Sequence, residues 1–194
     1  MPQRPAQTHP KRRRDAAATR SAILNAATRR FASQGYEHAG AREIAADAGV
    51  TAALVNRYFG SKEGLFAEVI DHALDVGSLM EGDRAALAER LARAVVHGRA
   101  DIVPDRDIPL LLLLHSIDEP RAAELLRTTL NRNMLPSLAE CIGGPDADVR
   151  AAMVIAQMVG FAILDRRIRL RQFARGRREQ IVALLSESLA VCIG

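Results

Sequence analysis

Residues 41–66 read AREIAADAGVTAALVNRYFGSKEGLF, and the fold assignment rests on this stretch. A short helix is expected over its first part, because apolar side chains recur on one helical face: Ile44, Ala45 and Ala48. Gly49 ends this helix, and Thr51 is a suitable N-cap for a second short helix that ends near Phe59. Two short helices around a glycine turn are typical of a helix-turn-helix, whose second helix enters the DNA major groove N-terminus first.

Helical periodicity continues on both sides of this stretch. Upstream, from Thr19 to a terminating Gly35, apolar positions follow helical spacing: Ile23, Ala26, Ala27 and Phe31. Downstream, a longer helix is expected from Lys62 to about Val76, and the chain beyond it shows no strand-like period of two. One later helix is expected over 121–142, with Pro136 as the candidate position for a kink. The sequence predicts an all-α fold of about nine helices, with a three-helix helix-turn-helix head before a C-terminal helical bundle.

Charge divides the chain into a basic head and a slightly acidic body. Residues 1–62 contain 11 Lys and Arg against 4 Asp and Glu, a net charge of +7, whereas 63–194 contain 16 against 19, a net charge of −3. Residues 1–16, with three prolines and a Lys-Arg-Arg-Arg run, are expected to form a flexible basic arm, either a solvated tail or a DNA-contacting one. Residues 17–62 are assigned to the DNA-binding domain and 63–194 to the body. Such asymmetry indicates that a polyanion binds at one end.

Composition argues against several other classes of protein. Cys141 and Cys192 are far apart, so neither a structural zinc site nor a disulfide framework is expected. The longest apolar run, Pro109–Leu114, is too short to span a membrane, and no apolar segment follows the basic N-terminus as in a secretory signal. We therefore expect a cytoplasmic protein without a membrane partner. No paired catalytic constellation is recognisable, so no catalytic residue, metal or cofactor is expected; three histidines are isolated: His72, His97 and His115.

Four groups of residues together resemble a known family signature: Gly35-Tyr36, Arg42-Glu43-Ile44-Ala45, Ala48-Gly49-Val50-Thr51 and YFGSKEGLF over 58–66. Over about residues 19–70 the chain resembles the TetR/AcrR family of transcriptional regulators, and behind that only helix number and rhythm agree. The resemblance implies a sequence-specific DNA-binding regulator. It favours a ligand-responsive repressor that binds a palindromic operator in double-stranded DNA as a homodimer and is released by a small, largely apolar effector.

Carried over by position, the resemblance assigns eight residues to the DNA interface: Arg42, Thr51, Ala52, Ala53, Asn56, Arg57, Tyr58 and Lys62. Arg42 is suited to guanine O6 and N7, and Asn56 to adenine N6 and N7. Tyr58 and Lys62 match phosphate-contacting positions of the family. The alternatives are a solvated side chain for Arg57 and a partly core position for Tyr58. A few apolar residues of the head are expected in its core: Phe31, Ile44, Leu54 and Phe59.

One departure from the family pattern lies just before the second helix. Family members often place Thr or Ser there, whereas this chain has Ala39 and Gly40. The usual side-chain cap is therefore missing, a loss of about 1 kcal/mol, together with a hydroxyl that would contact phosphate. We expect DNA binding to survive, with greater dependence on Arg42 and the N-terminal arm.

In the body, the resemblance implies a dimer interface and an effector pocket. Small and apolar residues of the last two long helices are the interface candidates, with an intramolecular core as the alternative: Ala152, Ala156, Gly160, Ile181, Leu185 and Leu189. The pocket candidates combine apolar side chains with a few polar ones, although most would equally suit a plain core: Leu110, Leu114, His115, Ile117, Leu130, Asn131, Met134, Met153, Gln157 and Phe161.

Three other functions compete with this interpretation. An enzyme is disfavoured by the missing catalytic motifs, and an architectural DNA binder leaves the large apolar body without a purpose. Activation instead of repression remains open from the sequence, as do the operator, the target genes and the effector.

Overall fold

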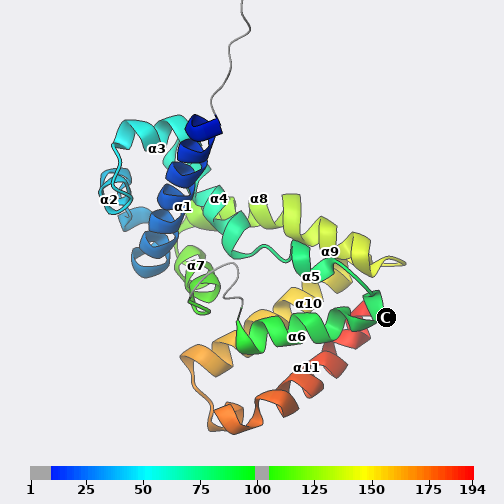
Figure 1. Ribbon diagram of the computed structural model, residues 1–194. Coiled ribbons are helices and arrows are strands. Elements are labelled where there is room, and N and C mark those ends of the chain that lie inside the picture. The colour runs from blue at the N-terminus through cyan, green and yellow to red at the C-terminus, as the bar shows by residue number, and fades with distance from the viewer. Residues whose placement is uncertain (1–9, 99–104) are drawn as a thin grey trace, which may run out of the picture.

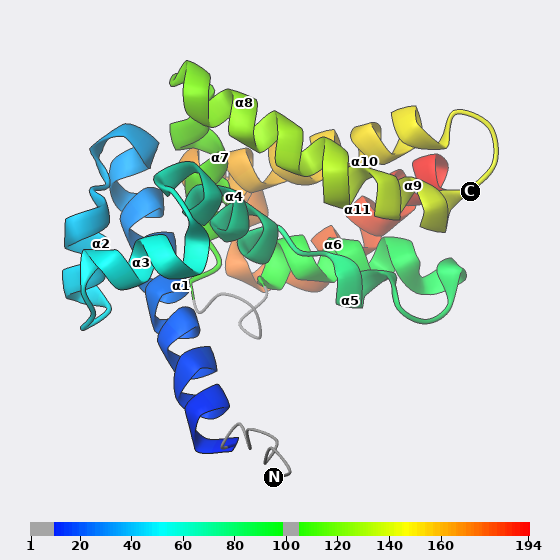
Figure 2. The same cartoon turned by 90° about the horizontal axis from the view of Figure 1, so that it is seen from above.

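The computed structural model describes residues 10–98 and 105–194, and within these ranges every regular element is a helix, which confirms the predicted all-α class (Figure 1). The α-helices are α1 (Pro10–His38), α2 (Ala41–Asp47), α3 (Ala52–Phe59), α4 (Lys62–Ala73), α5 (Gly77–Met80), α6 (Leu87–His97), α7 (Ile108–Ile117), α8 (Pro120–Thr129), α9 (Leu135–Ile142), α10 (Ala147–Ala162) and α11 (Arg178–Ile193). Short 3-10 turns lie at Arg84–Ala86, Arg171–Phe173 and Arg175–Arg177, and π turns at Leu130–Met134 and Ile163–Arg167. Helices α1 to α3 occupy one end of the molecule in both views (Figure 2).

The first helix begins earlier than the sequence suggests. Residues 1–9 of the expected arm lie outside the described residues, and α1 is already helical at Pro10, so the helix extends into the segment 10–16 that was assigned to the arm. Proline is tolerated in the first turn, where its missing N–H would have no helical partner. Arginine and the alanines at 16–18 are strong helix formers, so the segment extends α1 by several turns.

The expected kink near Pro136 takes the form of a widened turn. Helices α8 and α9 are joined without a loop by the π turn Leu130–Met134, directly ahead of Pro136 in α9. Proline has no N–H to donate to the carbonyl group one turn earlier in a helix. The π turn, with its different hydrogen-bonding pattern, accommodates this missing bond. If α8 and α9 are counted as one continuous helix and the single-turn α5 is left out, residues 10–98 and 105–194 contain nine helices, as predicted.

The head is built around an aromatic cluster between α1 and α4. The Phe66 ring of α4 lies 5.0 Å from the Phe31 ring in an edge-on arrangement, and 5.0 Å from the Tyr36 ring. Leu65, Val69 and other residues of α4 are buried in the same core. The boundary expected between residues 62 and 63 therefore passes through the core of the head, since α4 completes it.

A second core fills the body, and α7 contacts both cores. Helices α6, α9, α10 and α11 supply most of the body core, with α11 lying along α6. Along α7, Ile108 and Leu112 are buried in the head core, whereas Leu110 on the opposite face is buried in the body core. Head and body therefore share α7, and the continuous α8–α9 helix likewise supplies Ala122 to the head core and Leu138 to the body core.

The helical run Ala147–Arg167, formed by α10 and the π turn that follows it, is long and apolar enough to cross a membrane, with a mean hydropathy of 1.6. The expectation that no segment reaches this length is therefore corrected. Length and composition alone do not separate a membrane span from an apolar interface helix. Only 22% of its most apolar window is buried in the single chain, so much of its surface is available to another partner.

The link between α3 and α4 depends on a glycine. Ser61 caps α4 by accepting a hydrogen bond from the Gly64 N–H at 3.1 Å. A Cβ atom added at Gly64 would lie less than 3.0 Å from the backbone oxygen of Phe59. Only glycine lets the start of α4 approach the end of α3 this closely, and this approach sets the angle at which α3 leaves the core.

We predict that Gly64→Ala lowers the free energy of unfolding by about 1–3 kcal/mol, because the new methyl group forces backbone apart. Chemical denaturation measures this change. In the control Gly176→Ala, the added Cβ meets no atom within 4 Å, and stability should change by no more than about 0.5 kcal/mol. Equal stability of the two variants would contradict the close approach.

Candidate nucleic-acid interface and ligand cavity

The turn between α2 and α3 is held by backbone hydrogen bonds around Gly49. The Gly49 N–H donates to Ala46 O at 3.1 Å, and the Val50 N–H donates to Ala45 O at 2.9 Å. These are the two bonds of a Schellman motif, which requires a left-handed residue after the helix. Gly49 has φ +67° and meets this requirement without strain.

Helix α3 turns one face into the head core and the other outward. Val55 and Phe59, one turn apart, are buried at 2% and 7% exposure. The opposite face consists of Ala53, Asn56 and Arg57, all exposed. The core packing of α3 therefore leaves the predicted base-facing positions free to meet a ligand.

The N-terminus of α3 is also open. Thr51 occupies the N-cap position, but its hydroxyl makes no capping bond with any described residue and its side chain is exposed. Ala52 is half-buried against the core and opens the helix. The first amides of a helix have no intrahelical acceptor, so this end favours a phosphate or another anion.

Helix α2 begins without a capping hydroxyl, in line with the departure seen in the sequence. The cap is Gly40, whose backbone N–H donates to the Glu43 carboxylate at 3.3 Å. Only one half of a capping box is present, because glycine has no side chain to complete it. Arg42, in the first turn, is exposed.

An ion pair that the sequence analysis did not identify fastens α2 to α1. Arg30 Nε donates to Asp47 Oδ2 at 2.5 Å and Arg30 Nη2 donates to Asp47 Oδ1 at 3.0 Å, a two-pronged arrangement. The hydrogen bond from Arg30 lowers the pKa of Asp47 below its ordinary value. Seventeen positions separate the two residues, so no local spacing rule connects them.

Lys62 has an intramolecular role besides its predicted DNA contact. Its Nζ donates to Glu37 O at 3.0 Å and lies 4.7 Å above the Tyr36 ring. The ammonium group therefore closes the C-terminal end of α1, where helix carbonyls favour a cation. Tyr58 is half-buried beside Phe59, between the core and the surface, as the alternative interpretation allowed.

A largely apolar cavity of about 140 Å³ lies in the body. Its walls come from the end of α4, from α6 and α7, from the π turn at Leu130–Met134 and from α10. Three of the ten predicted pocket residues line it: Leu110, Leu130 and Met134. The wall residues that the sequence analysis did not select include Ala73, Leu74 and two arginines, Arg106 and Arg166.

The other seven pocket candidates do not line this cavity. His115, Ile117, Asn131 and Met153 are exposed. Leu114 packs at the edge of the body core, and the Phe161 ring lies 5.1 Å from the Phe173 ring in a tilted arrangement. Gln157 accepts a hydrogen bond from Ser188 on α11 at 2.6 Å. Six of the seven lie on α7 and α10, whose rotation about their axes turns them away from the cavity, and Asn131 points outward from the π turn Leu130–Met134.

The dimer candidates divide into two groups. Ala152 and Ala156 are exposed and Gly160 is half-buried, on the outward side of α10. On α11, Ile181 and Leu189 are buried against the body core and Leu185 is half-buried, so the first two are corrected to core residues. Large apolar side chains are instead exposed beside the α10 stripe: Val149, Met153, Leu164, Leu184 and Val191.

Two family models match the chain. Residues 23–69 match the bacterial regulatory proteins of the tetR family, and residues 85–193 match the tetracyclin repressor-like C-terminal domain. No curated protein matches the chain at a significant level.

Solved structures of low sequence identity share the fold. A TetR-family regulator from Streptomyces coelicolor A3 is 24% identical, with a TM-score of 0.63 over 97% of this chain and 99% of that one. NalD from Pseudomonas aeruginosa, the secondary repressor of the MexAB-OprM multidrug efflux pump, is 24% identical, with a TM-score of 0.61 over 89% and 97%. GusR from Salmonella enterica is 19% identical, with a TM-score of 0.59 over 89% and 95%.

We predict that Arg30→Gln raises the pKa of Asp47 toward its ordinary value, because the main cause of the lowered pKa is removed. Since the folded pKa is depressed, the ion pair stabilises the fold above the ordinary aspartate pKa and its contribution is lost as pH falls through the lowered value. Carbon-detected NMR titration of the carboxyl group measures this. The neighbouring Arg29→Gln is the control and should cause a smaller shift; an unchanged Asp47 in Arg30→Gln would refute the assignment.

Proposed function

We propose that this chain, which belongs to the TetR family of bacterial transcription regulators, is a ligand-responsive repressor that acts as a cytoplasmic homodimer on a palindromic operator. The family assignment stands on the two matched domains, of which the C-terminal one covers more than half of the chain. The observation that carries the proposal is the orientation of α3, whose apolar face is buried and whose polar face and N-terminus are open. A helix presented in this way suits the major groove.

The proposed DNA contacts follow from this orientation. Thr51, Ala52 and Ala53 lead into the groove, where their short side chains permit close approach to the bases. Asn56 and Arg57, one turn further on, reach base edges or phosphates. Arg42 reads a base from the start of α2, whereas Tyr58 and Lys62 contact phosphate. The net charge of +7 on residues 1–62 supports the binding of a polyanion by this end of the chain.

The proposed dimer uses the outward faces of α10 and α11. Ala152, Ala156 and Gly160 would allow close approach of a second copy, and Leu184 and Val191 would be covered by it. Val191 is 83% exposed in the single chain, a large value for an aliphatic residue among other exposed apolar ones. The exposed apolar surface of the 147–167 run supports the same partner.

The proposed regulation couples the cavity to the head through α4. Ala73, near the C-terminal end of α4, belongs to the head core and also lines the cavity, beside Leu74. A ligand that favours one position of this helix end would change the spacing of the two heads relative to half-sites about 34 Å apart. A tenfold loss of operator affinity requires only about 1.4 kcal/mol of coupling.

The proposal is tested by selecting genomic fragments that bind the purified full-length protein and footprinting the recovered DNA. A regulator protects a short palindrome and prefers it to random duplex at moderate salt. Uniform protection of every duplex would instead indicate an architectural protein, and no preference at all would overturn the proposal.

We predict that Arg42→Ala weakens operator binding by about 1–3 kcal/mol, because a bidentate contact to a base edge is lost, while binding to random duplex falls much less. Fluorescence anisotropy with operator and scrambled DNA measures both affinities. Arg132→Ala, which removes an exposed arginine of the body, is the control and should leave both unchanged. Unaltered operator affinity in Arg42→Ala would place the base-reading surface elsewhere.

We predict that Leu184→Glu converts the dimer to a monomer, because a carboxylate would be buried in the apolar interface. Operator affinity should fall roughly tenfold or more, since one head reads only a half-site. Sedimentation velocity gives the mass and circular dichroism checks the helix content. Ile117→Glu alters a similarly exposed apolar residue on α7 and should remain dimeric; a dimeric Leu184→Glu would remove α11 from the interface.

A further inference from the structure

The helical run Ala147–Arg167 has an outward face that is apolar along its length and charged, with opposite signs, at its two ends. Three large apolar side chains are exposed along it: Val149, Met153 and Leu164. Helix α11 packs beside α10, and Leu184 on it is also exposed. An apolar face with charges only at its ends can bind another surface in a defined direction, because the charges distinguish one end from the other.

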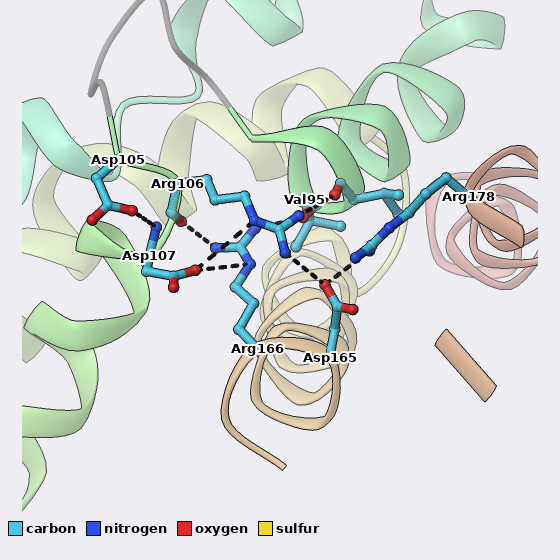
Figure 3. Close-up of polar contacts among 8 residues, drawn as sticks. Val95, Asp105, Arg106, Asp107, Asp165, Arg166 and Arg178 are labelled. Carbon is cyan, nitrogen blue, oxygen red and sulfur yellow. Dashed lines mark hydrogen bonds and ion pairs between the residues drawn. The ribbon is translucent and has the colours of Figure 1, made fainter. Parts of the chain in front are cut away.

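The C-terminal end of the run is strongly basic. The segment 166–178 contains seven arginines and no acidic residue. Arg166 is buried and donates to backbone oxygens, and Arg178 pairs with Asp165 at 2.9 Å (Figure 3). Four others are exposed, and their side chains form no hydrogen bond or ion pair with any described residue: Arg167, Arg169, Arg171 and Arg177.

The acidic side chains near this basic end are engaged elsewhere. The Asp165 carboxylate, 3% exposed, faces Arg178 and Arg106, and Asp107 Oδ1 lies 3.8 Å from Arg166 Nε. Glu179, at the start of α11, pairs with Arg93 and His97 of α6. Residues 99–104, outside the described ranges, contain one arginine and one aspartate and so add no net charge. The exposed arginines therefore present a positive surface.

The N-terminal end of the run is acidic. Glu140 at the end of α9 and Asp146 and Asp148 at the start of α10 are exposed, and none of the three carboxylates has an ion-pair partner among the described residues. One arginine lies close by, Arg150, but it donates to the backbone oxygens of Gly143, Pro145 and Cys192. Figure 1 shows the acidic end, in yellow, and the basic segment, in orange, on opposite sides of the body.

Two-fold symmetry decides how two copies can meet along this face. Most homodimers are two-fold, so that a residue i of one copy contacts j of the other and j contacts i. Ala156 lies at the middle of the outward small-residue stripe, with Asp146 ten residues before it and Arg167 eleven residues after it. Each is therefore about 15 Å from Ala156 along the helix. An antiparallel pair centred on Ala156 brings Asp146 and Arg167 to the same level, whereas a parallel pair brings each beside its own like charge.

We propose that two copies of this chain pack antiparallel along α10, with Arg167 of each copy paired with Asp146 of the partner subunit. This inference rests on the proposed function, because it assumes the homodimer; it adds the direction and the register of the two subunits. Helices that meet through small residues lie about 8 Å apart, a gap that an arginine and an aspartate side chain together span. Burial of the apolar face supplies the affinity, and the charged ends select the direction.

The test is a charge swap on the full-length protein, with the dimer dissociation constant measured by sedimentation equilibrium. Arg167→Asp and Asp146→Arg each place like charges together at both ends of the interface, so each should raise the dissociation constant roughly tenfold or more. The double variant Asp146→Arg/Arg167→Asp restores opposite charges and should recover most of the lost affinity. Arg132→Asp, which reverses an exposed arginine outside α10 and α11, is the control and should have no effect.

The direction of packing is also measurable without changing the charge pair. A nitroxide label is attached to Arg171→Cys after Cys141 and Cys192 are replaced by serine, and the distance between the two labels of a dimer is measured by pulsed electron resonance. Antiparallel packing should separate the labels by roughly 30 Å or more, because each lies at least about 15 Å from the two-fold axis. Parallel packing should place them within about 20 Å of each other.

Three results would overturn the inference: single variants that dimerise as tightly as the unaltered protein, a folded double variant no tighter than the single ones, or labels within about 20 Å. Circular dichroism checks that each variant is folded. If Asp146→Arg does not fold, Arg167→Asp and the label distance decide. A dimer that is indifferent to the charge changes would retain the proposed function and remove only this packing, whereas an unaltered protein that is monomeric would remove the proposed dimer itself.

Discussion

The packing of Phe66 between Phe31 and Tyr36 is the contact on which the rest of the structure depends. It joins α4 to α1 and so completes a core against which α2 and α3 are held. Small domains have little apolar surface to bury, so a head of three helices alone would be marginal. With α4 included, Val55 and Phe59 gain a fixed surface to pack on. The polar face of α3 therefore points outward because Val55 and Phe59, on its opposite face, are buried in the head core.

Helices α4 and α7 together connect the two halves of the molecule. From the aromatic cluster, α4 continues to Ala73 and the cavity wall, while α7 supplies apolar side chains to both cores. Close-packed interiors deform little within one arrangement and tend to move between discrete ones. In the proposed regulation, α4 and α7 would therefore pass a small change at the cavity to the head.

The ionic cluster around Asp165 and Arg166 is an unusual component of such a body. Burying charges costs free energy that their mutual attraction often fails to recover, and apolar replacements of similar size are frequently no less stable. Here the carboxylate of Asp165 is 3% exposed and the side chain of Arg166 is 5% exposed, and the pairing between the groups is incomplete. Arg166 nevertheless ties the end of α10 to α6 and to the segment before α7, through the backbone oxygens of Val95 and Arg106.

The sequence by itself determined the all-α class, the breaks at Gly35 and Gly49, and the two short helices between them and Phe59, because glycine conformation and helical periodicity act within a few residues. Tertiary structure decided what required knowledge of a distant neighbour. Apolar spacing marked α11 as two-sided, but only its packing against α6 distinguished buried Leu189 from exposed Leu184. The pocket was placed on the wrong faces of α7 and α10 for the same reason, since periodicity shows that a helix has an inner face without showing which cavity that face meets. The Arg30–Asp47 pair and the inward turn of Arg166 had no local signal, because one joins separate helices and the other follows from a π turn.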